Sequence, residues 1–206
     1  SDLLVGRFAV ANESGLSTLI DKIIAYEESD PNQEWRRRTL WVADDAYSTD
    51  LIGAGSGCYR FQSIELDFLT SQQASAAVVQ GSLDQTIASA VLDADVYTRD
   101  CRLGDACENL TGVRNCFDVN HRAEFIDRWS QGWLWLSYQG HANFNVLGHE
   151  NLLLANGVSQ LRNDGRPFVF FGMGCHVSDF LGADEGSKGP SLGELVLRLP
   201  RAGAIA

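Results

Sequence analysis

Two apolar runs, each leading into a reactive side chain, constrain the fold of this chain more than any other feature. Residues 133–140 run into His141, and residues 168–174 run into Cys175. Strands without polar alternation are typical of a parallel sheet covered on both faces, and such sheets bind ligands at the carboxyl ends of their strands. The sequence therefore predicts that His141 and Cys175 lie at one edge of the same sheet.

The pairing of these two side chains favours nucleophilic catalysis. A thiol beside an imidazole is a nucleophile beside its base. Taken singly, a cysteine or a histidine near a strand end is more often a structural group. Their joint placement after two apolar strands, with room between for one crossover helix at about residues 151–161, favours catalysis.

The first helix is predicted from an apolar stripe at helical spacing, which consists of Leu16, Leu19, Ile20, Ile23 and Ile24. We expect Asp21, Lys22 and Glu27 on its solvent side. A strand at 39–43 should bring Asp44 and Asp45 to the sheet edge where His141 emerges.

The remaining pattern alternates between helices and strands. Further helices are expected around residues 61–69, 123–129 and 191–199, and a strand is expected to begin within residues 202–206. This alternation predicts an α/β three-layer sandwich with a mainly parallel sheet. We expect one domain over residues 1–206, truncated at its C-terminal strand and associated with the remainder of a longer parent protein.

Charge and hydropathy restrict the partners. The formal net charge of −11 argues against nucleic acid, which needs a basic stripe. No apolar run reaches the roughly 18 residues expected of a membrane span. A protein or peptide substrate fits these limits.

The other cysteines favour an exported protein. Cys101, Cys107 and Cys116 lie in a polar insertion near residues 100–117, and Cys58 lies elsewhere. Their spacing does not fit tetrahedral zinc, so we expect one or two disulfides of open connectivity. An extracellular, cell-surface or periplasmic location follows, and Cys175 is the cysteine expected to stay free.

The paired motifs Gly140-His141 and Gly174-Cys175, with Ser-Asp-Phe-Leu at residues 178–181, resemble the gingipain-like cysteine peptidases. The resemblance also covers residues 2–8 and the first helix, and it is weakest between about residues 70 and 115. It implies a caspase-like fold and endopeptidase activity.

The implied mechanism uses a Cys/His dyad and a thioester intermediate. Cys175 would attack the peptide carbonyl, and His141 would protonate the leaving amine and then activate water. The resemblance assigns the oxyanion hole to the backbone N–H groups of Ala142 and Cys175. Gly140 and Gly174 would let the substrate backbone approach closely.

Two positions depart from the family pattern. Ala142 stands where glycine is usual, and Gly174 stands where alanine is common. A methyl group at 142 is tolerable at negative φ, but it would tilt the N–H if positive φ were required. A non-catalytic binding module on the same scaffold therefore stays open, and so does a transpeptidase or sorting enzyme that shares the acylation step.

An orienting acid and substrate preference are less well defined. An acid would orient His141 by accepting its other ring N–H, and Asp44 is favoured for this role over Asp45 and Asp118. In arginine-cleaving gingipains an acid before a helix reads the guanidinium, and the corresponding residues 55–61 contain no acid. The stretch also contains an arginine, which argues against cleavage after arginine and leaves an acidic or a small side chain before the scissile bond open.

No metal ligand set is predicted. A zinc site from His141, His149, Glu150 and His176 matches no known ligand spacing. No cofactor is required, although a structural calcium ion stays open at two acid clusters, Asp44 with Asp45 and Asp50, or Asp179 with Asp184 and Glu185.

Overall fold

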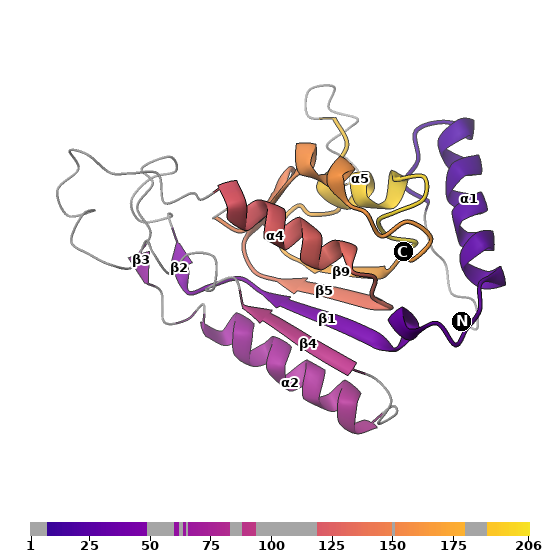
Figure 1. Ribbon diagram of the computed structural model, residues 1–206. Coiled ribbons are helices and arrows are strands. Elements are labelled where there is room, and N and C mark those ends of the chain that lie inside the picture. The colour runs from indigo at the N-terminus through magenta and orange to yellow at the C-terminus, as the bar shows by residue number, and fades with distance from the viewer. Residues whose placement is uncertain are drawn as a thin grey trace, which may run out of the picture.

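A parallel four-stranded sheet forms the centre of the molecule. The computed structural model describes residues 8–48, 60–61, 64, 66–82, 88–93, 119–149, 151–179 and 189–206. The sheet has the order β4-β1-β5-β9 (Figure 1), and its strands are β4 (Ala88–Asp93), β1 (Arg38–Ala43), β5 (Trp135–Gln139) and β9 (Val169–Met173). All three pairings are parallel, so the predicted α/β architecture with a parallel sheet is confirmed.

One face of the sheet carries the main core. Alternate residues of the strands pack there against α4 (Val119–Ser130) and α5 (Leu192–Arg198). The fully buried side chains of this core include Leu40, Leu136, Tyr138, Phe125, Trp129, Phe168, Leu192 and Val196. Burial of each large apolar side chain contributes about 1.5–3 kcal/mol, so this face holds the sheet and its helices together.

The other face is covered by α2 (Leu66–Ser82), which packs along β4 and β1. Its buried Gln72 donates through Nε2 to the carbonyl of Val42 (3.2 Å) and to Oγ of Ser137 (3.1 Å). Over β9 the same face is more open, because Phe171 and Met173 remain exposed. Helices on both faces complete the predicted layers.

Helix α1 (Glu13–Glu28) begins at the N-cap Asn12, whose side chain accepts from the Gly15 N–H. The helix was predicted, but the orientation of its side chains was wrong in part. Lys22 is buried, whereas Ile20 and Ile24 are exposed. The ammonium group of Lys22 donates to the carbonyls of Leu197 (2.7 Å), Leu199 (2.8 Å) and Ala202 (3.3 Å).

A carbonyl cluster at the end of α5 therefore explains the buried lysine. The unsatisfied carbonyls and the negative end of the helix dipole favour a cation there. Burial lowers the pKa of Lys22 to about 8. The local apolar period of α1 carries no information on this distant cluster, so it could not predict the rotation of the helix.

Other elements differ in extent from the sequence prediction. The helix expected at 61–69 begins at Leu66 and continues to Ser82, and β4 was not predicted. The crossover helix expected at 151–161 is replaced by β8 (Leu153–Leu154) and a 3₁₀ helix (Ala155–Gln160). The helices predicted near 123–129 and 191–199 are present as α4 and α5.

Where a strand was expected to begin within residues 202–206, the structure has one isolated bridge beside the start of β9 and no strand. Ala204 forms a parallel bridge with Phe168. The Phe168 N–H donates to the Gly203 carbonyl (3.2 Å), and the Phe170 N–H donates to the Ala206 carbonyl (2.8 Å). Two small antiparallel sheets complete the described strands. In one, β2 (Tyr47–Ser48) pairs with β3 (Arg60–Phe61), and in the other β7 (Val146–Leu147) pairs with both β6 (Ala142–Asn143) and β8.

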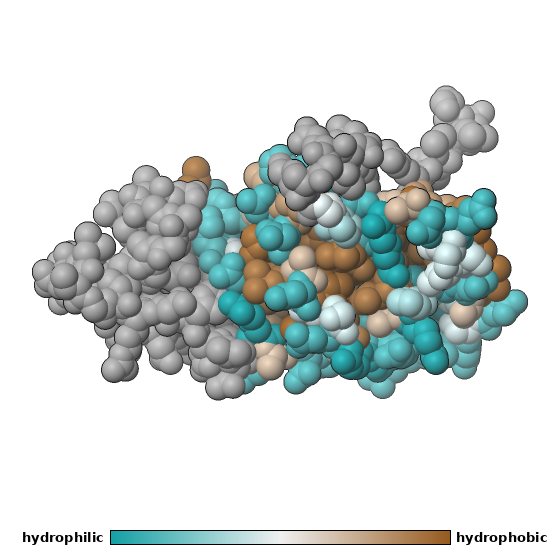
Figure 2. All heavy atoms as spheres, turned by 90° about the horizontal axis from the view of Figure 1, so that it is seen from above, coloured by the Kyte–Doolittle hydropathy of each residue, from teal (hydrophilic) through white to brown (hydrophobic). Residues whose placement is uncertain are grey.

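Figure 2 shows hydrophobic residues in the middle of this face and again at its right edge, with hydrophilic residues over most of the rest of the coloured surface. Within the described ranges, no helix has both the length and the apolar character that crossing a membrane requires.

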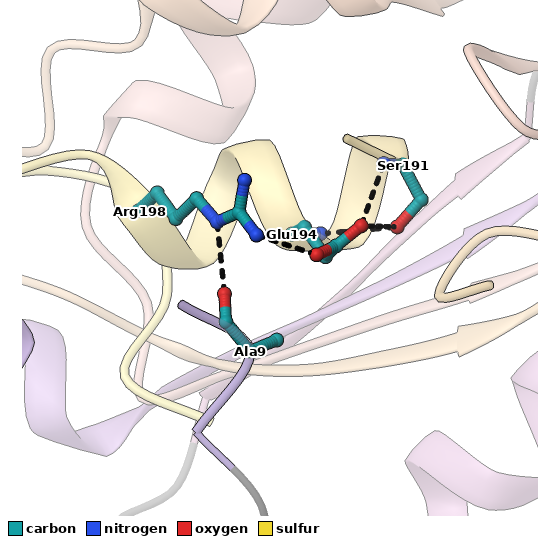
Figure 3. Close-up of polar contacts among 4 residues, drawn as sticks. All are labelled: Ala9, Ser191, Glu194 and Arg198. Carbon is teal, nitrogen blue, oxygen red and sulfur yellow. Dashed lines mark hydrogen bonds and ion pairs between the residues drawn. The ribbon is translucent and has the colours of Figure 1, made fainter. Parts of the chain in front are cut away.

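Helix α5 is fixed at its start and along its length by one buried carboxylate. Ser191 and Glu194 form a capping box, in which each side chain bonds the other residue's backbone N–H. Glu194 also accepts from the Arg198 guanidinium (2.6 Å), and Arg198 Nε donates to the Ala9 carbonyl (2.8 Å), as Figure 3 shows. The carboxylate is 4% exposed, so its ion pair is shielded from water.

We expect Arg198→Met to lower the free energy of unfolding by about 1–3 kcal/mol. Methionine keeps the hydrocarbon stem but leaves the buried Glu194 charge without its cation. Urea unfolding followed by circular dichroism measures the loss. Arg201→Met is the matched control, because Arg201 is exposed and its change should cost under about 0.5 kcal/mol. Equal stability of the two variants would contradict the prediction.

Candidate active site

The ends of β5 and β9 bring the two reactive residues to neighbouring positions. Gln139 pairs with Met173 in the parallel register, and the Gly140 N–H donates to the Met173 carbonyl (3.2 Å). A Cβ added to Gly174 would lie 3.0 Å from the Gly140 carbonyl oxygen, so the strands are still in contact one residue later. His141 and Cys175 therefore leave the sheet directly after adjacent strand ends.

The backbone of His141 is held on both sides of its Cα. Its N–H donates to Asp44 Oδ2 (2.7 Å), and its carbonyl accepts from the Tyr138 hydroxyl and from the Gly148 N–H (2.8 Å). Tyr138 is fully buried. These three hydrogen bonds fix the backbone from which the imidazole extends, although none of them involves a ring atom.

Two aromatic neighbours contact the half-buried imidazole of His141. Phe68 of α2 meets it edge-on, with ring centroids 5.6 Å apart and planes at 85°. His149 stacks on its face, with centroids 4.4 Å apart and planes at 18°. The sequence suggested His149 only as a weak metal candidate. The short hairpin β6–β7, which returns the chain to His141, is the feature that could have predicted the position of His149.

Cys175 is an exposed, free thiol at the start of a sharp turn. The next residue, His176, has a φ of 58°, which is uncommon for a residue other than glycine. Its Nδ1 lies 3.2 Å from Asp179 Oδ2. The turn is anchored by the buried Val177, whose carbonyl accepts from the Gly193 N–H of α5 (2.8 Å).

The two positions that depart from the family pattern contact each other. A Cβ added to Gly174 would lie 2.7 Å from the Cβ of Ala142. Ala142 lies in β6, and among the described residues other than glycine only Asn151 and His176 have positive φ. The methyl group of Ala142 therefore imposes no backbone strain, and it fills the space that glycine leaves at position 174.

Asp44 is the acid that the structure places at His141, and it bonds the backbone N–H. It is 2% exposed, and a Cβ added to Gly140 would lie 2.1 Å from the Asp44 Cβ, so only glycine fits there. Burial raises the pKa of Asp44 to about 7, and the charge of Asp45 adds to the rise. The bonds from His141 and Asp45 N–H groups oppose it.

Several sequence hypotheses lie outside the described residues. These are Asp118 as an acid, Asp50, Asp184 and Glu185 as calcium ligands, residues 55–59 as a specificity segment, and the cysteines Cys58, Cys101, Cys107 and Cys116. Within the described ranges, no group of three or more His, Cys, Asp or Glu residues could hold a metal ion. Asp44 and Asp45 are both buried.

A comparison with protein-family models identifies the family of this chain. A model described as peptidase family C25 matches residues 1–206. The chain belongs to peptidase family C25. The resemblance to gingipain-like peptidases drawn from the motifs is therefore confirmed, and with it a fold of the cysteine-peptidase type.

Solved structures resemble this C25 chain in fold. The chain is similar to the Arg-specific cysteine proteinase gingipain R, RgpB, with 18% identity and a TM-score of 0.63 over 97% of this chain and 38% of that one. It is also similar to a complex of Porphyromonas gingivalis RgpB pro- and mature domains, with 18% identity and a TM-score of 0.65 over 99% of this chain and 40% of that one. A structure described as a protease gives 16% identity and a TM-score of 0.54, over 95% and 34%.

The C25 chain thus spans about two fifths of the RgpB chains it matches. At this identity the likeness establishes the caspase-like fold alone. No curated protein matches the sequence.

Proposed function

We propose that the protein is a cysteine endopeptidase in which Cys175 is the nucleophile and His141 the general acid and base. The observation that carries the proposal is the position of the two residues directly after adjacent strand ends, in a chain of the C25 family. A reactive cysteine must be accessible, and Cys175 is exposed and forms no disulfide. His141 is half-buried, which suits a base that must stay oriented while it exchanges protons.

In the proposed reaction the Cys175 thiolate attacks the scissile carbonyl carbon, and the carbonyl electrons move to oxygen. The backbone N–H groups of Ala142 and Cys175 are proposed to stabilise this oxyanion. The C–N bond then breaks as His141 gives a proton to the leaving amine, and a thioester remains. Water, losing its proton to His141, cleaves the thioester and restores the thiol.

Two further roles belong to the same proposal. Asp44 would orient His141 by accepting a hydrogen bond from the backbone N–H of His141 (2.7 Å). Gly140 and Gly174 would contribute to substrate binding through their backbone atoms, since Asp44 and Ala142 occupy the space that a Cβ at these positions would take. The protein would act outside the cytoplasm on protein or peptide substrates, a location that the family membership supports.

The test is profiling of the full-length protein against a peptide library, beside its Cys175→Ala and His141→Ala forms. We expect cleavage by the wild-type protein and none by Cys175→Ala. Iodoacetamide should label Cys175 faster than it labels free cysteine, and His141→Ala should remove that advantage. Equal cleavage by the wild-type and Cys175→Ala forms would overturn the proposal. A ligated product formed when an amine is supplied would identify a transpeptidase instead, and ordinary thiol reactivity without turnover would identify a binding module.

A further inference from the structure

His149 occupies the face of the imidazole of His141. The two rings are nearly parallel, at 18°, with centroids 4.4 Å apart. Phe68 contacts the same imidazole edge-on from α2, so neighbours from two separate elements limit its rotation. Rotation of the His141 imidazole about its side-chain bonds would break the stacked contact with His149.

The fold, rather than chance contact, holds His149 there. The hairpin β6–β7 pairs Ala142 with Leu147, and the Gly148 N–H donates to the His141 carbonyl (2.8 Å). The Leu152 N–H donates to the Leu147 carbonyl (2.8 Å), and both leucines are buried in the core. His149 is therefore attached to the core on either side of its position and is itself half-buried.

We propose that His149 is a positioning residue for the dyad: its ring holds the plane of the His141 imidazole toward Cys175. This inference rests on the proposed function of His141 and Cys175. It assigns His149 no contact with substrate.

The test compares His149→Phe with His149→Ala in the full-length protein, using the rate of Cys175 alkylation by iodoacetamide at neutral pH. Phenylalanine keeps a flat ring that can stack on His141, so the rate should stay within about twofold of wild type. Alanine removes the ring, and the rate should fall about 10-fold.

Val146→Ala is the control, because it trims a side chain of the same hairpin and keeps the His149 ring, so its rate should stay near that of wild type. Melting temperatures identify any variant that is slow because it is unfolded. If His149→Ala matches the wild-type rate, if His149→Phe is as slow as His149→Ala, or if Val146→Ala is equally slow, the inference is overturned. If His141→Ala leaves the alkylation of Cys175 unchanged, the proposed function itself fails, whatever the His149 variants do.

Discussion

Gly174→Ala is expected to slow the alkylation and the catalytic turnover of Cys175 by at least about 100-fold, and Ala142→Gly is expected to recover most of that loss. The added Cβ would lie 2.7 Å from the Cβ of Ala142, closer than real Cβ contacts allow. The backbone at 174 must then shift, and Cys175 shifts with it.

The double variant tests whether the two positions are coupled. Removing the methyl group of Ala142 takes away the closest contact of the new side chain. The remaining contacts, 3.0 Å to the Gly140 carbonyl and 3.2 Å to Val177, are tight but can relax by a few tenths of an ångström. The effects of the single variants should therefore be non-additive, as expected for residues in contact.

Iodoacetamide labelling rates and melting temperatures measure both effects. Gly81→Ala is the matched control, because a Cβ at that position on α2 meets nothing within 4 Å. Its labelling rate should equal that of the wild-type protein. A Gly174→Ala protein with a rate within twofold of wild type, or a double variant as slow as the single one, would contradict the coupling.

This coupling also shows what the sequence could and could not predict. The apolar strands 135–139 and 169–173 predicted the sheet and the positions of His141 and Cys175 along the chain, because strand burial is a local pattern. The contact between Ala142 and Gly174 depends on how two loops leave neighbouring strands, which no local pattern encodes. Considered separately, the two departures from the family pattern left a non-catalytic module open; in the structure the methyl group of Ala142 lies where a side chain at position 174 would need room, so the two positions cannot both carry one without a shift.

Buried polar groups were missed for a similar reason. Lys22 was assigned to the solvent side of α1 because lysine usually lies there, yet the carbonyls at the end of α5 offset the cost of its burial. Gln72 lies on a stretch of α2 with almost no helical amphipathicity, and its partners are Val42 and Ser137 on two different strands. Long-range hydrogen-bond partners decide such positions, and these become visible only with the fold.

Asp44→Asn is expected to stabilise the folded protein at pH 8 by about 1–3 kcal/mol and to leave its stability near pH 4 almost unchanged. The pKa of Asp44 is raised from its ordinary value of 3.8 to about 7, chiefly by burial. Between about pH 4 and pH 7 the folded state therefore binds more protons than the unfolded state. Its stability must fall as the pH rises through this window, because ionising Asp44 costs more in the folded protein.

Asparagine keeps an oxygen that can accept from the His141 N–H but carries no charge. The stability of the variant should therefore depend little on pH in this window. The gain at pH 8 is reduced by the cost of placing the amide N–H₂ beside the Asp45 N–H, which in the wild-type protein donates to Asp44 Oδ1 (3.2 Å). Urea unfolding at pH 4, 6 and 8 measures the difference. Asp164→Asn serves as the control, since that aspartate is exposed and its variant should follow the wild-type curve.

An unchanged pH dependence in Asp44→Asn would show that another group causes it, and Asp45, buried beside it, would be the next to test. A charge that lowers stability at neutral pH persists more readily where it serves a site. If Asp44 is such a charge, Asp44→Ala, which leaves the His141 N–H without its acceptor, should slow Cys175 alkylation far more than Asp44→Asn does. Equal rates in the two variants would mean that Asp44 contributes to packing alone.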